Sequence, residues 1–232
     1  GMSYSAKKPV VDRMLEALPG TLMLAGTALV FTLLYALPAG IISALNRNKW
    51  VDYLLRAASF VGVSMPTFWL GLVLIYIFGL KLGLVPIATS RVTPIGVILP
   101  AATLAVVVGS KYMRQVRLVI LEEMEKDYVI GARARGVSEM KILFGHILPN
   151  AVLPLITILG VLIGWLLGGV AVVEMVFSWP GLGNMAVYAI TMRDYPLIEG
   201  FVLWVALAYM CINALIDASY VLLDPRLKRE RA

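Results

Sequence analysis

Long stretches without a charged side chain divide this chain. Asp, Glu, Lys and Arg are absent between Glu16 and Arg47, Arg56 and Lys81, Arg91 and Lys111, and Lys141 and Glu174. A helix needs about 20 predominantly apolar residues to cross the hydrocarbon core of a bilayer. The pattern therefore predicts five membrane-spanning helices, at about residues 20–45, 57–80, 92–112, 150–173 and 200–223.

A helical pattern continues beyond the third predicted span. Met113, Val116, Ile120 and Met124 recur at intervals of three or four residues, and charged side chains occupy the other faces. This spacing predicts that the third span runs on into the cytoplasm and packs there against another element.

The segment 127–149 is predicted to form a helix–turn–helix elbow. Gly136 ends its first helix, because glycine adopts the left-handed C-cap conformation without steric cost. Ser138 is a favourable N-cap for a second short helix. That helix is expected to end before Leu148-Pro149, so the elbow would stand between two spans.

Proline and glycine indicate the other breaks. Pro19 is expected to end an amphipathic lead-in helix within residues 1–19, on the outer surface. Pro66 removes a backbone hydrogen bond from the second span, and neighbouring groups must compensate for it. The Pro/Gly-rich stretch 177–183 cannot face lipid with its backbone groups unsatisfied, which predicts an outer re-entrant loop over 174–195.

Composition places the chain in a bilayer. Of its 232 residues, 60% are hydrophobic and 15% charged, and the mean hydropathy is +0.88. Soluble domains average about 45–50% and 25% for these two classes. The composition excludes a soluble globular protein, a disordered chain and a nucleic-acid-binding module. It predicts an all-α polytopic membrane protein with its transmembrane domain over 20–224.

The net charge of +6 reflects topology. Fourteen of the 20 Lys and Arg residues fall in segments 46–56, 111–146 and 224–232. Cytoplasmic loops carry an excess of these residues, so the three segments, with a basic tail over 225–232, are predicted to be cytoplasmic. Five spans then place the N-terminus outside, where a short chain without a signal peptide rarely begins. A preceding span is therefore expected to be missing.

Candidate chemistry is sparse. The single cysteine, Cys211, permits no intramolecular disulfide, and the single histidine, His146, cannot form a multi-histidine metal site. No G-x-x-x-x-G-K-[ST] phosphate-binding loop occurs, so the chain is not expected to bind ATP itself. We therefore expect no metal, no cofactor and no enzymatic activity on this chain.

Glu174 is the strongest individual candidate outside the elbow. A carboxylate at membrane depth costs about 2.5–3.5 kcal/mol, so it is usually paired or faces water. Two interpretations stay open: Glu174 forms the outer gate or wall of a translocation path, or it bonds to the backbone of 177–183. Asp217, in the last span, is interpreted as a helix-packing polar group.

Small and aromatic residues supply further candidates. Gly160, Gly164 and Gly168 lie on one helix face at four-residue spacing, which lets another helix approach closely. Met and aromatic side chains on a span more often face lipid or pack, but some could line a path. The candidates for this role are Met65, Phe68, Trp69 and Trp165.

The run DYVIGARARGVSEMKILFGHILPNAVLP, over 127–154, resembles the cytoplasmic EAA loop of permeases from binding-protein-dependent ABC importers. Gly136 and Leu148-Pro149 fall in register, and Ala132 takes the second alanine position. The peptide/nickel branch of this family tolerates the departures seen here. These are Ile130 in place of the glutamate, Gly131 in place of the first alanine, and His146 in place of the isoleucine.

Further segments follow in the family's order, so the resemblance covers about residues 9–230. They are similar to the first permease subunit of dipeptide, oligopeptide or nickel importers (the dipeptide/oligopeptide permease B-type). The segments are Leu18-Pro19 with Thr21-Leu22, 66–71 (PTFWLG), Val173-Glu174 with 177–183 (FSWPGLG), 193–196 (RDYP) and 223–226 (LDPR).

The resemblance implies a type I importer permease fold of about five spans, lacking the usual first helix, in the bacterial or archaeal cytoplasmic membrane. It implies four partners: a second homologous permease, cytoplasmic ABC ATPase subunits that carry ATP-Mg, an outer solute-binding protein, and membrane lipid. The solute would be a peptide, nickel or a similar small solute. The elbow would dock on the ATPase through Ala132, Arg133, Ala134, Arg135, Gly136, Val137, Ser138, Glu139, Leu148 and Pro149.

Two alternatives from other classes stay open. An ion-coupled secondary transporter would use Glu174, Glu199 and Asp217 as ion-binding groups, although no inverted second half is visible in the chain. A membrane scaffold would use the elbow only to recruit a cytoplasmic protein.

Overall fold

The computed structural model describes residues 1–87 and 91–223, with all their side chains except those of 167–169 and 219–223. The predicted tail over 225–232 lies outside the described residues. The described chain is almost entirely helical. Its helices are α1 (Val10–Leu45), α2 (Trp50–Ser64), α3 (Thr67–Leu74), η1 (Ile75–Lys81), α4 (Ile98–Met124), α5 (Asp127–Ala134), α6 (Glu139–Ile142), η2 (Leu143–Ile147), α7 (Leu148–Gly169), α8 (Ala171–Val176), α9 (Leu182–Thr191) and α10 (Tyr195–Leu223).

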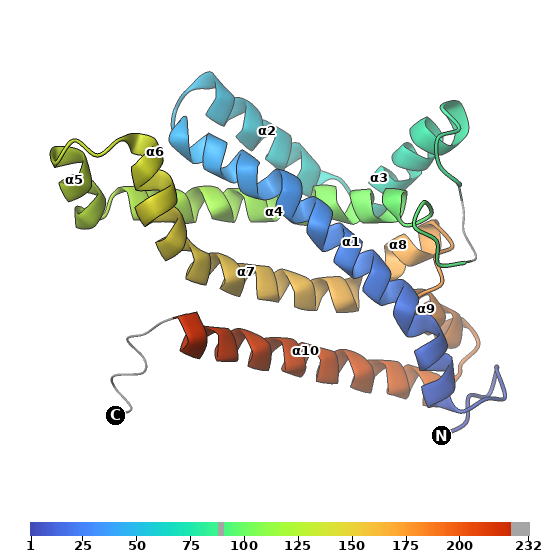
Figure 1. Ribbon diagram of the computed structural model, residues 1–232. Coiled ribbons are helices and arrows are strands. Elements are labelled where there is room, and N and C mark those ends of the chain that lie inside the picture. The colour runs from blue at the N-terminus through green and yellow to red at the C-terminus, as the bar shows by residue number, and fades with distance from the viewer. Residues whose placement is uncertain (88–90, 224–232) are drawn as a thin grey trace.

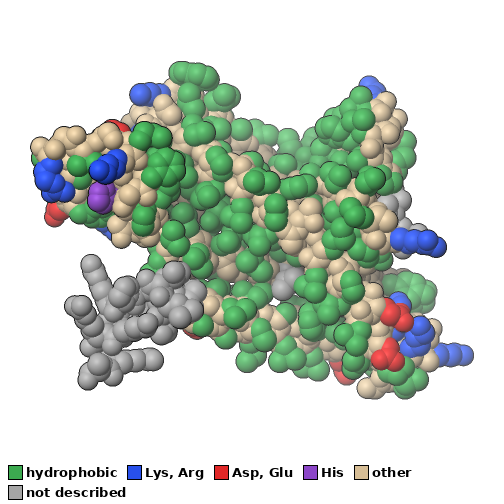
Figure 2. Space-filling view, in the orientation of Figure 1, with side chains coloured by type: hydrophobic (Ala, Val, Ile, Leu, Met, Phe, Trp, Pro, Cys, Tyr) green, Lys and Arg blue, Asp and Glu red, His purple; other side chains and the backbone are tan. Residues whose placement is uncertain are grey.

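The long helices run between two polar ends. In Figure 1, the axes of α4, α7 and α10 lie roughly side by side, with the chain in α7 running opposite to the other two, and α1 crosses them diagonally. The α5–α6 elbow projects at one end, and α8, α9 and the N-terminus lie at the other. Apolar side chains cover the middle of the face in Figure 2. Lys, Arg and His side chains gather over the elbow, and Lys, Arg, Asp and Glu side chains gather at the opposite end, near the N-terminus. Both ends of the bundle are therefore polar, and its middle is apolar.

Among the described residues, three helices are long and apolar enough to cross a membrane, or four if α2 and α3–η1 count as one bent span. By length and composition alone, three or four of the five predicted spans meet this criterion. The helix that falls short is α4, because Lys111, Arg114 and Arg117 lie within it. It packs against α1, α2 and α7 and buries 16 of its residues, so its surroundings are mainly protein.

Pro19 does not end a helix. The predicted lead-in helix and first span form one 36-residue helix, α1, which contains both Pro19 and Pro38. A proline inside a helix removes one backbone hydrogen bond, but neighbouring helices in a membrane protein can hold the segment in place. Val10 and Met14 of this stretch pack with Leu182 and Leu197, which fix its direction.

Pro66 lies where the second predicted span is divided into two helices. Helices α2 and α3–η1 meet at an angle of 102°. Met65 adopts an extended conformation (ψ 129°), as expected for a residue that precedes proline. The prediction of a single helix over 57–80 is therefore wrong, and the structure has a bent pair there.

The second helix of the elbow does not end at Leu148-Pro149. Helix α6 continues through a π-helical turn, Leu143–Ile147, directly into α7. Pro149 has no N–H group to donate, and the wider π turn before it shifts the hydrogen-bond register. The side-chain amide of Asn150 also donates to the carbonyl of His146 at 2.7 Å. The elbow is thus continuous with the fourth predicted span.

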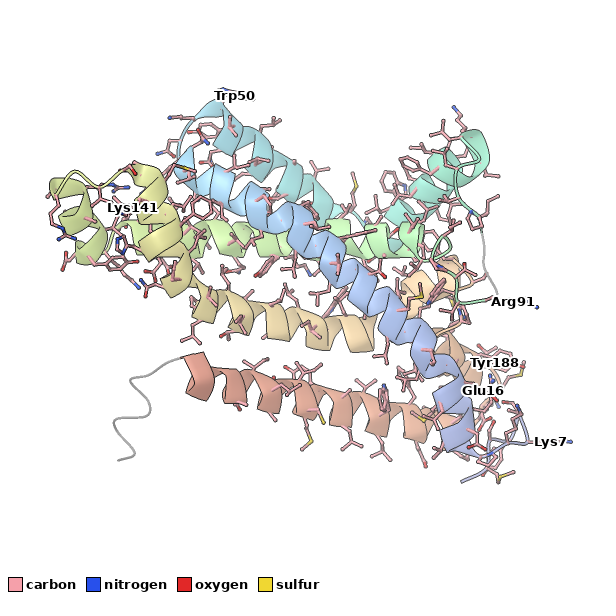
Figure 3. All side chains as sticks on the ribbon, viewed as in Figure 1. Lys7, Glu16, Trp50, Arg91, Lys141 and Tyr188 are labelled. Carbon is pink, nitrogen blue, oxygen red and sulfur yellow. The ribbon has the colours of Figure 1, made fainter. Side chains whose placement is uncertain are left out.

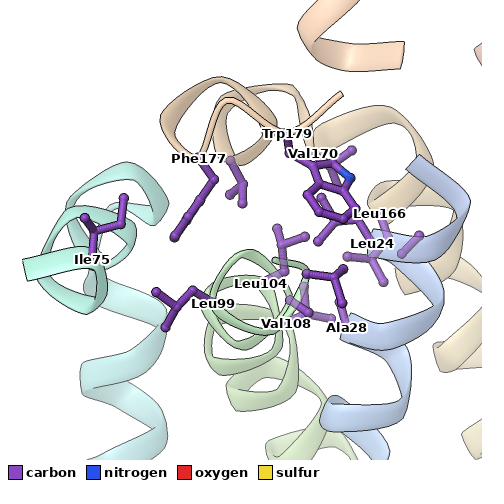
Figure 4. Close-up of a cluster of buried hydrophobic side chains, with 14 residues drawn as sticks. Leu24, Ala28, Ile75, Leu99, Leu104, Val108, Leu166, Val170, Phe177 and Trp179 are labelled. Atoms are coloured by element: carbon purple, nitrogen blue, oxygen red, sulfur yellow. The ribbon is translucent and has the colours of Figure 1, made fainter. Parts of the chain in front are cut away.

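One apolar core lies between α1, α4, α7 and the outer hairpin (Figure 4). Leu24, Leu104 and Leu166 meet Phe177 and Trp179 there, and all five side chains are at most 3% exposed. A second core fills the cytoplasmic half between α1, α4, the elbow and α7.

The predicted glycine face of α7 lies against α10. A Cβ atom on Gly164 would lie 2.7 Å from the ring of Tyr209, and one on Gly160 would overlap Ile216. The surroundings of Gly168 lie outside the described side chains.

A buried carboxylate joins the first helical turn of α2 to α1 and α4. The side chain of Asp52 has no exposed area and accepts hydrogen bonds from Arg117 Nε and Nη2, both at 2.8 Å. Ser43 Oγ donates to the same carboxylate at 2.6 Å and the Asn48 amide at 3.0 Å. Charge-assisted, two-point contacts of this kind are the stronger hydrogen bonds in proteins.

We expect Asp52→Ala to destabilise the protein strongly, because it leaves the guanidinium of Arg117 nearly buried without its carboxylate. The loss should be about 3 kcal/mol or more, as for other broken buried ion pairs. Thermal unfolding of the purified protein in detergent measures it.

The matched control is Arg47→Ala. The Arg47–Glu125 ion pair joins the same two regions but is exposed on both sides (54% and 66%), so its loss should cost at most about 1 kcal/mol. Equal destabilisation by the two variants would contradict the importance of the Asp52 contact.

Candidate functional site

The base of the elbow is fastened to α4. Glu123, 5% exposed, accepts hydrogen bonds from Tyr128 at 2.6 Å and from Lys126 at 2.5 Å. Burial and the neighbouring Glu123 carboxylate raise the pKa of Tyr128 to about 12, so its hydroxyl stays protonated and donates at neutral pH. The first turn of α5 is therefore held in a fixed position.

The turn of the elbow depends on Gly136. This residue has φ +74°, and its amide donates to the Arg133 carbonyl at 2.9 Å. The next amide, of Val137, returns to the Ala132 carbonyl at 3.2 Å, which closes the C-terminus of α5. Ser138 occupies the N-cap position of α6, as predicted, but its side chain makes no capping hydrogen bond.

The two arginines of the elbow differ in their surroundings. Arg133 forms a two-point ion pair with Glu139 across the turn, at 2.8 and 3.0 Å. Its pKa is raised by this hydrogen-bonded carboxylate, so the pair stays charged. Within the described part of the chain, Arg135 has no carboxylate within ion-pair distance, and its side chain is exposed.

The elbow has a buried face and an exposed face. Val129, Ala132 and Ile142 are at most 1% exposed and join the cytoplasmic core, so Ala132 packs inward in this structure. Three large apolar side chains point outward: Ile130, Met140 and Phe144 are 54–63% exposed. The remaining predicted residues Ala134 and Pro149 are also exposed, while Val137 and Leu148 are half-buried.

Sequence reasoning missed Phe144 and treated Ile130 only as a departure from a motif. The i, i+4 spacing of Met140 and Phe144 could have indicated a shared helix face. Ile142 and Leu143, between them, are buried, so hydropathy alone does not separate the two faces.

At the outer end, Glu174 caps another helix. Its side chain is fully buried, with Oε1 accepting from Thr21 Oγ1 at 2.7 Å and Oε2 accepting from the Asn184 amide at 2.8 Å. Thr21 Oγ1 in turn accepts from the Leu182 amide at 2.8 Å. Amides in the first turn of α9 thus receive oxygen partners from α8 and α1.

The hairpin between α8 and α9 packs closely against Glu174 and the start of α1. Trp179, 0% exposed, donates from Nε1 to the Gly20 carbonyl at 2.9 Å. A Cβ atom on Gly181 would overlap the Glu174 carboxylate, and one on Gly20 would overlap the Pro180 carbonyl. The segment 174–195, predicted to be an outer re-entrant loop, is a helical hairpin that contains α9, and the side chain of Glu174 has no exposed area in this structure.

The remaining candidates do not form one site. Met65, Phe68 and Trp69 line an apolar hollow of about 460 Å³ at the α2–α3 bend. Trp165 lies elsewhere, on α7, with the Lys111 ammonium 5.4 Å from its ring centre. Asp217 is exposed on α10, so its interpretation as a helix-packing group is wrong within this chain. No cluster of three His, Cys, Asp or Glu side chains suited to a metal occurs in the part of the chain that the structure describes.

The helical bundle has the fold of solved ABC transporter chains. The chain superposes on the MetNI methionine ABC transporter in an inward-facing conformation with a TM-score of 0.75 and 18% identity, over 93% of this chain and 98% of that one. An amino acid ABC transporter structure gives a TM-score of 0.65 at 18% identity, over 90% and 92%. These likenesses support the fold.

Sequence comparison places the chain within a family. Residues 36–229 match the family "Binding-protein-dependent transport system inner membrane component". The chain is 37% identical to the glutathione transport system permease protein GsiC of Escherichia coli K12 over 228 residues, which are 98% of this chain and 74% of that protein. The same protein of Shigella flexneri serotype 5b is equally similar.

The chain belongs to the binding-protein-dependent transport system inner membrane component family. It is the permease of a binding-protein-dependent ABC importer of the peptide/nickel type, and a multi-pass protein of the bacterial inner membrane. The resemblance read from the sequence is thereby confirmed at the level of the family. Its relatives are transport permeases, not enzymes.

We expect Gly136→Ala to loosen the elbow. An alanine at positive φ is strained by about 1–2 kcal/mol, and the open space around this position leaves the backbone as the cause. Faster hydrogen exchange over α5 and α6, with unchanged exchange in α7, is the expected result. Gly145→Ala is the control, because its Cβ also meets open space but its backbone is helical; faster exchange there too would contradict the explanation.

We expect Glu174→Gln to destabilise the outer hairpin, because an amide nitrogen would replace one oxygen that now accepts a donor. Loss of such a buried contact costs about 1–3 kcal/mol. The readout is faster proteolysis or hydrogen exchange over 171–191. Glu199→Gln, on an exposed side chain of α10, should leave both unchanged. An unchanged hairpin in Glu174→Gln would contradict the capping role.

Proposed function

We propose that the chain forms half of a translocation path with a second, related permease, and that cytoplasmic ABC ATPase subunits drive it. The ATPase subunits carry ATP-Mg, and an outer solute-binding protein delivers the solute. Family membership and the exposed face of the elbow support this proposal. A peptide-like solute is favoured, because the similar GsiC proteins are named as glutathione permeases.

One observation carries the proposal. Ile130, Met140 and Phe144 expose large apolar side chains on the elbow, a segment that also exposes Arg135. Exposed large apolar side chains and arginine are both enriched at protein interfaces. The elbow is also continuous with α7, so a partner bound there acts directly on a membrane-spanning helix. Arg133 and Glu139 stabilise the turn in this proposal, and Arg135 contacts the ATPase.

The geometry disfavours the ion-coupled carrier. Glu199 and Asp217 are 18 residues apart on α10, which separates them by about 27 Å along the helix axis. Glu174 is buried against Thr21 and α9. Groups placed in this way do not form one ion site. A scaffold would leave the bent α2–α3 pair and its apolar hollow without a role.

The proposed path residues are Met65, Phe68 and Trp69, at the α2–α3 bend. They lie on one hollow, half-buried or exposed, where a helix pair is bent between two apolar segments. Broken helices at membrane depth are a feature of transport routes in other carriers. In this proposal Glu174 positions the outer hairpin and Trp165 packs with Lys111.

We expect Phe144→Ser to weaken ATPase binding by about tenfold or more, as for a central aromatic side chain of an interface. Affinity capture of the co-expressed ATPase measures it, and reconstituted uptake of glutathione should fall in parallel. Ile190→Ser is a matched control, because Ile190 and Phe144 are both 61% exposed and Ile190 lies at the outer end.

The energy source of transport is tested in the same reconstituted uptake measurement. Uptake should stop with vanadate and persist with a protonophore. The reverse result would contradict ATP-driven transport, and absence of uptake with every partner present would favour the scaffold.

A further inference from the structure

The middle of α4 carries a lysine. Lys111 lies 13 residues from Ile98 and 13 from Met124, so about 20 Å of helix separates it from each end. Figure 3 labels Trp50 toward the elbow end and Tyr188 at the opposite end, and the middle of α4 lies between them. Lys111 is therefore far from both polar ends of the bundle.

Residues next to Lys111 contact two of the candidate membrane spans. Tyr35 of α1 donates to the Ala105 carbonyl at 2.9 Å, and Tyr112 donates to the Leu155 carbonyl of α7 at 3.5 Å. Tyr35 and Leu155 lie 10 and 7 residues from the ends of their helices nearer the elbow, about 15 and 11 Å along each axis. Both helices are long and apolar enough to cross a membrane, so Lys111 lies at membrane depth.

The ammonium of Lys111 has an aromatic contact but, among the described residues, no carboxylate within ion-pair distance. Its Nζ lies 5.4 Å from the ring centre of Trp165 on α7. Lys111 is exposed and Trp165 is 41% exposed, so the pair lies on an open face of the chain. A lysine exposed to hydrocarbon at this depth is costly, and a cation–π contact offsets only part of that cost. Lipid is therefore an unfavourable neighbour for this face.

Three further exposed residues continue this face of α4 toward the elbow. Lys111, Gln115, Leu118 and Glu122 follow one another at intervals of three or four residues, so they share one side of the helix, here called the α4 strip. Three of the four are polar or charged. In contrast, the exposed side chains of α10 over 201–216 include no charged or amide group, as expected for a surface that faces lipid. The α4 strip has the composition of a surface that faces water.

We propose that the α4 strip faces water in the translocation path, with Lys111 as the cationic group of that path at membrane depth and Trp165 beside it. That such a path exists rests on the proposed function. An ammonium in this position attracts the negatively charged group of a solute, such as the carboxylate of a peptide, and repels cations. The path therefore favours anionic solutes over a bare divalent cation.

Cysteine labelling tests whether the α4 strip is wet. Gln115→Cys, with the native thiol removed by Cys211→Ser, is reconstituted in liposomes with the co-expressed second permease and ATPase subunits. A membrane-impermeant methanethiosulfonate is then added on both sides of the bilayer. The matched control is the unaltered chain, whose free Cys211 is exposed on the apolar face of α10.

We expect the thiol at position 115 to react at least about tenfold faster than Cys211, because apolar surroundings raise the pKa of a thiol and suppress the reactive thiolate. No labelling at position 115, or labelling no faster than at Cys211, would overturn the proposal.

The charge of Lys111 is tested at the same position with two reagents. Sulfonatoethyl methanethiosulfonate is anionic, and trimethylammonioethyl methanethiosulfonate is cationic. A unit charge about 6 Å away changes each labelling rate about threefold in water, in opposite directions, so adding Lys111→Gln should lower the anionic-to-cationic rate ratio about tenfold. Lys111→Arg keeps the charge and should leave the ratio unchanged. An unchanged ratio in Lys111→Gln would contradict the cationic role, and a carboxylate of the second permease paired with Lys111 would give this result.

Uptake distinguishes this proposal from the proposed function. Labelling is measured without nucleotide and does not require transport. A complex that takes up solute but is not labelled at position 115 contradicts only the role of the α4 strip. A chain that assembles with no second permease contradicts both proposals.

Discussion

A buried carboxylate needs hydrogen-bond partners, because burying it without them is costly. Three buried carboxylates meet this need by joining other elements of the chain to α1. Asp52, Glu174 and Asp194 have no exposed area. Each accepts a hydrogen bond from a hydroxyl group of α1 or of the residues just before it. The hydroxyl groups belong to Ser43, Thr21 and Ser3. One carboxylate thus fastens α1 near its cytoplasmic end, one in its outer half and one ahead of its first turn. The α2 turn, the α8–α9 hairpin and the start of α10 are attached to the bundle through these contacts.

Much of the fold follows from the sequence because single residues fix local geometry. Gly136 predicts the turn of the elbow, since only glycine adopts φ +74° without strain, and the Met113–Met124 pattern predicts that α4 continues past the membrane. The errors share a cause. Pro19, Pro66 and Pro149 were each expected to have a particular effect, but a proline's outcome depends on what packs around it. Pro19 lies inside α1. Pro66 stands at the break between two helices that meet at 102°, and Pro149 follows a π turn through which the helix stays continuous.

The candidate site was predictable in position but not in orientation. The sequence predicts the position of the elbow correctly. In the structure, however, Ala132 packs inward, and Arg133 is ion-paired with Glu139. Which face of a helix as short as α5, with eight residues, points outward depends on the core that it meets, and that core comes from α1, α4 and α7. Glu174 was identified as unusual because a carboxylate in an apolar run is costly. Its partners lie 153 and 10 residues away along the chain, so only the fold could reveal that it caps α9.

The unbroken helical path from the elbow into α7 has a mechanical consequence. The apolar segment Glu139–Leu166 comprises 28 residues and, at 1.5 Å per residue, measures about 42 Å. A rod of this length amplifies rotation: a tilt of about 10° at its cytoplasmic end displaces the other end by about 7 Å. The outer end of α7 leads within a few residues to Glu174 and the hairpin that it anchors. The π turn at Leu143–Ile147 lies near the elbow end of this helical path, where the hydrogen-bond register of the helix changes.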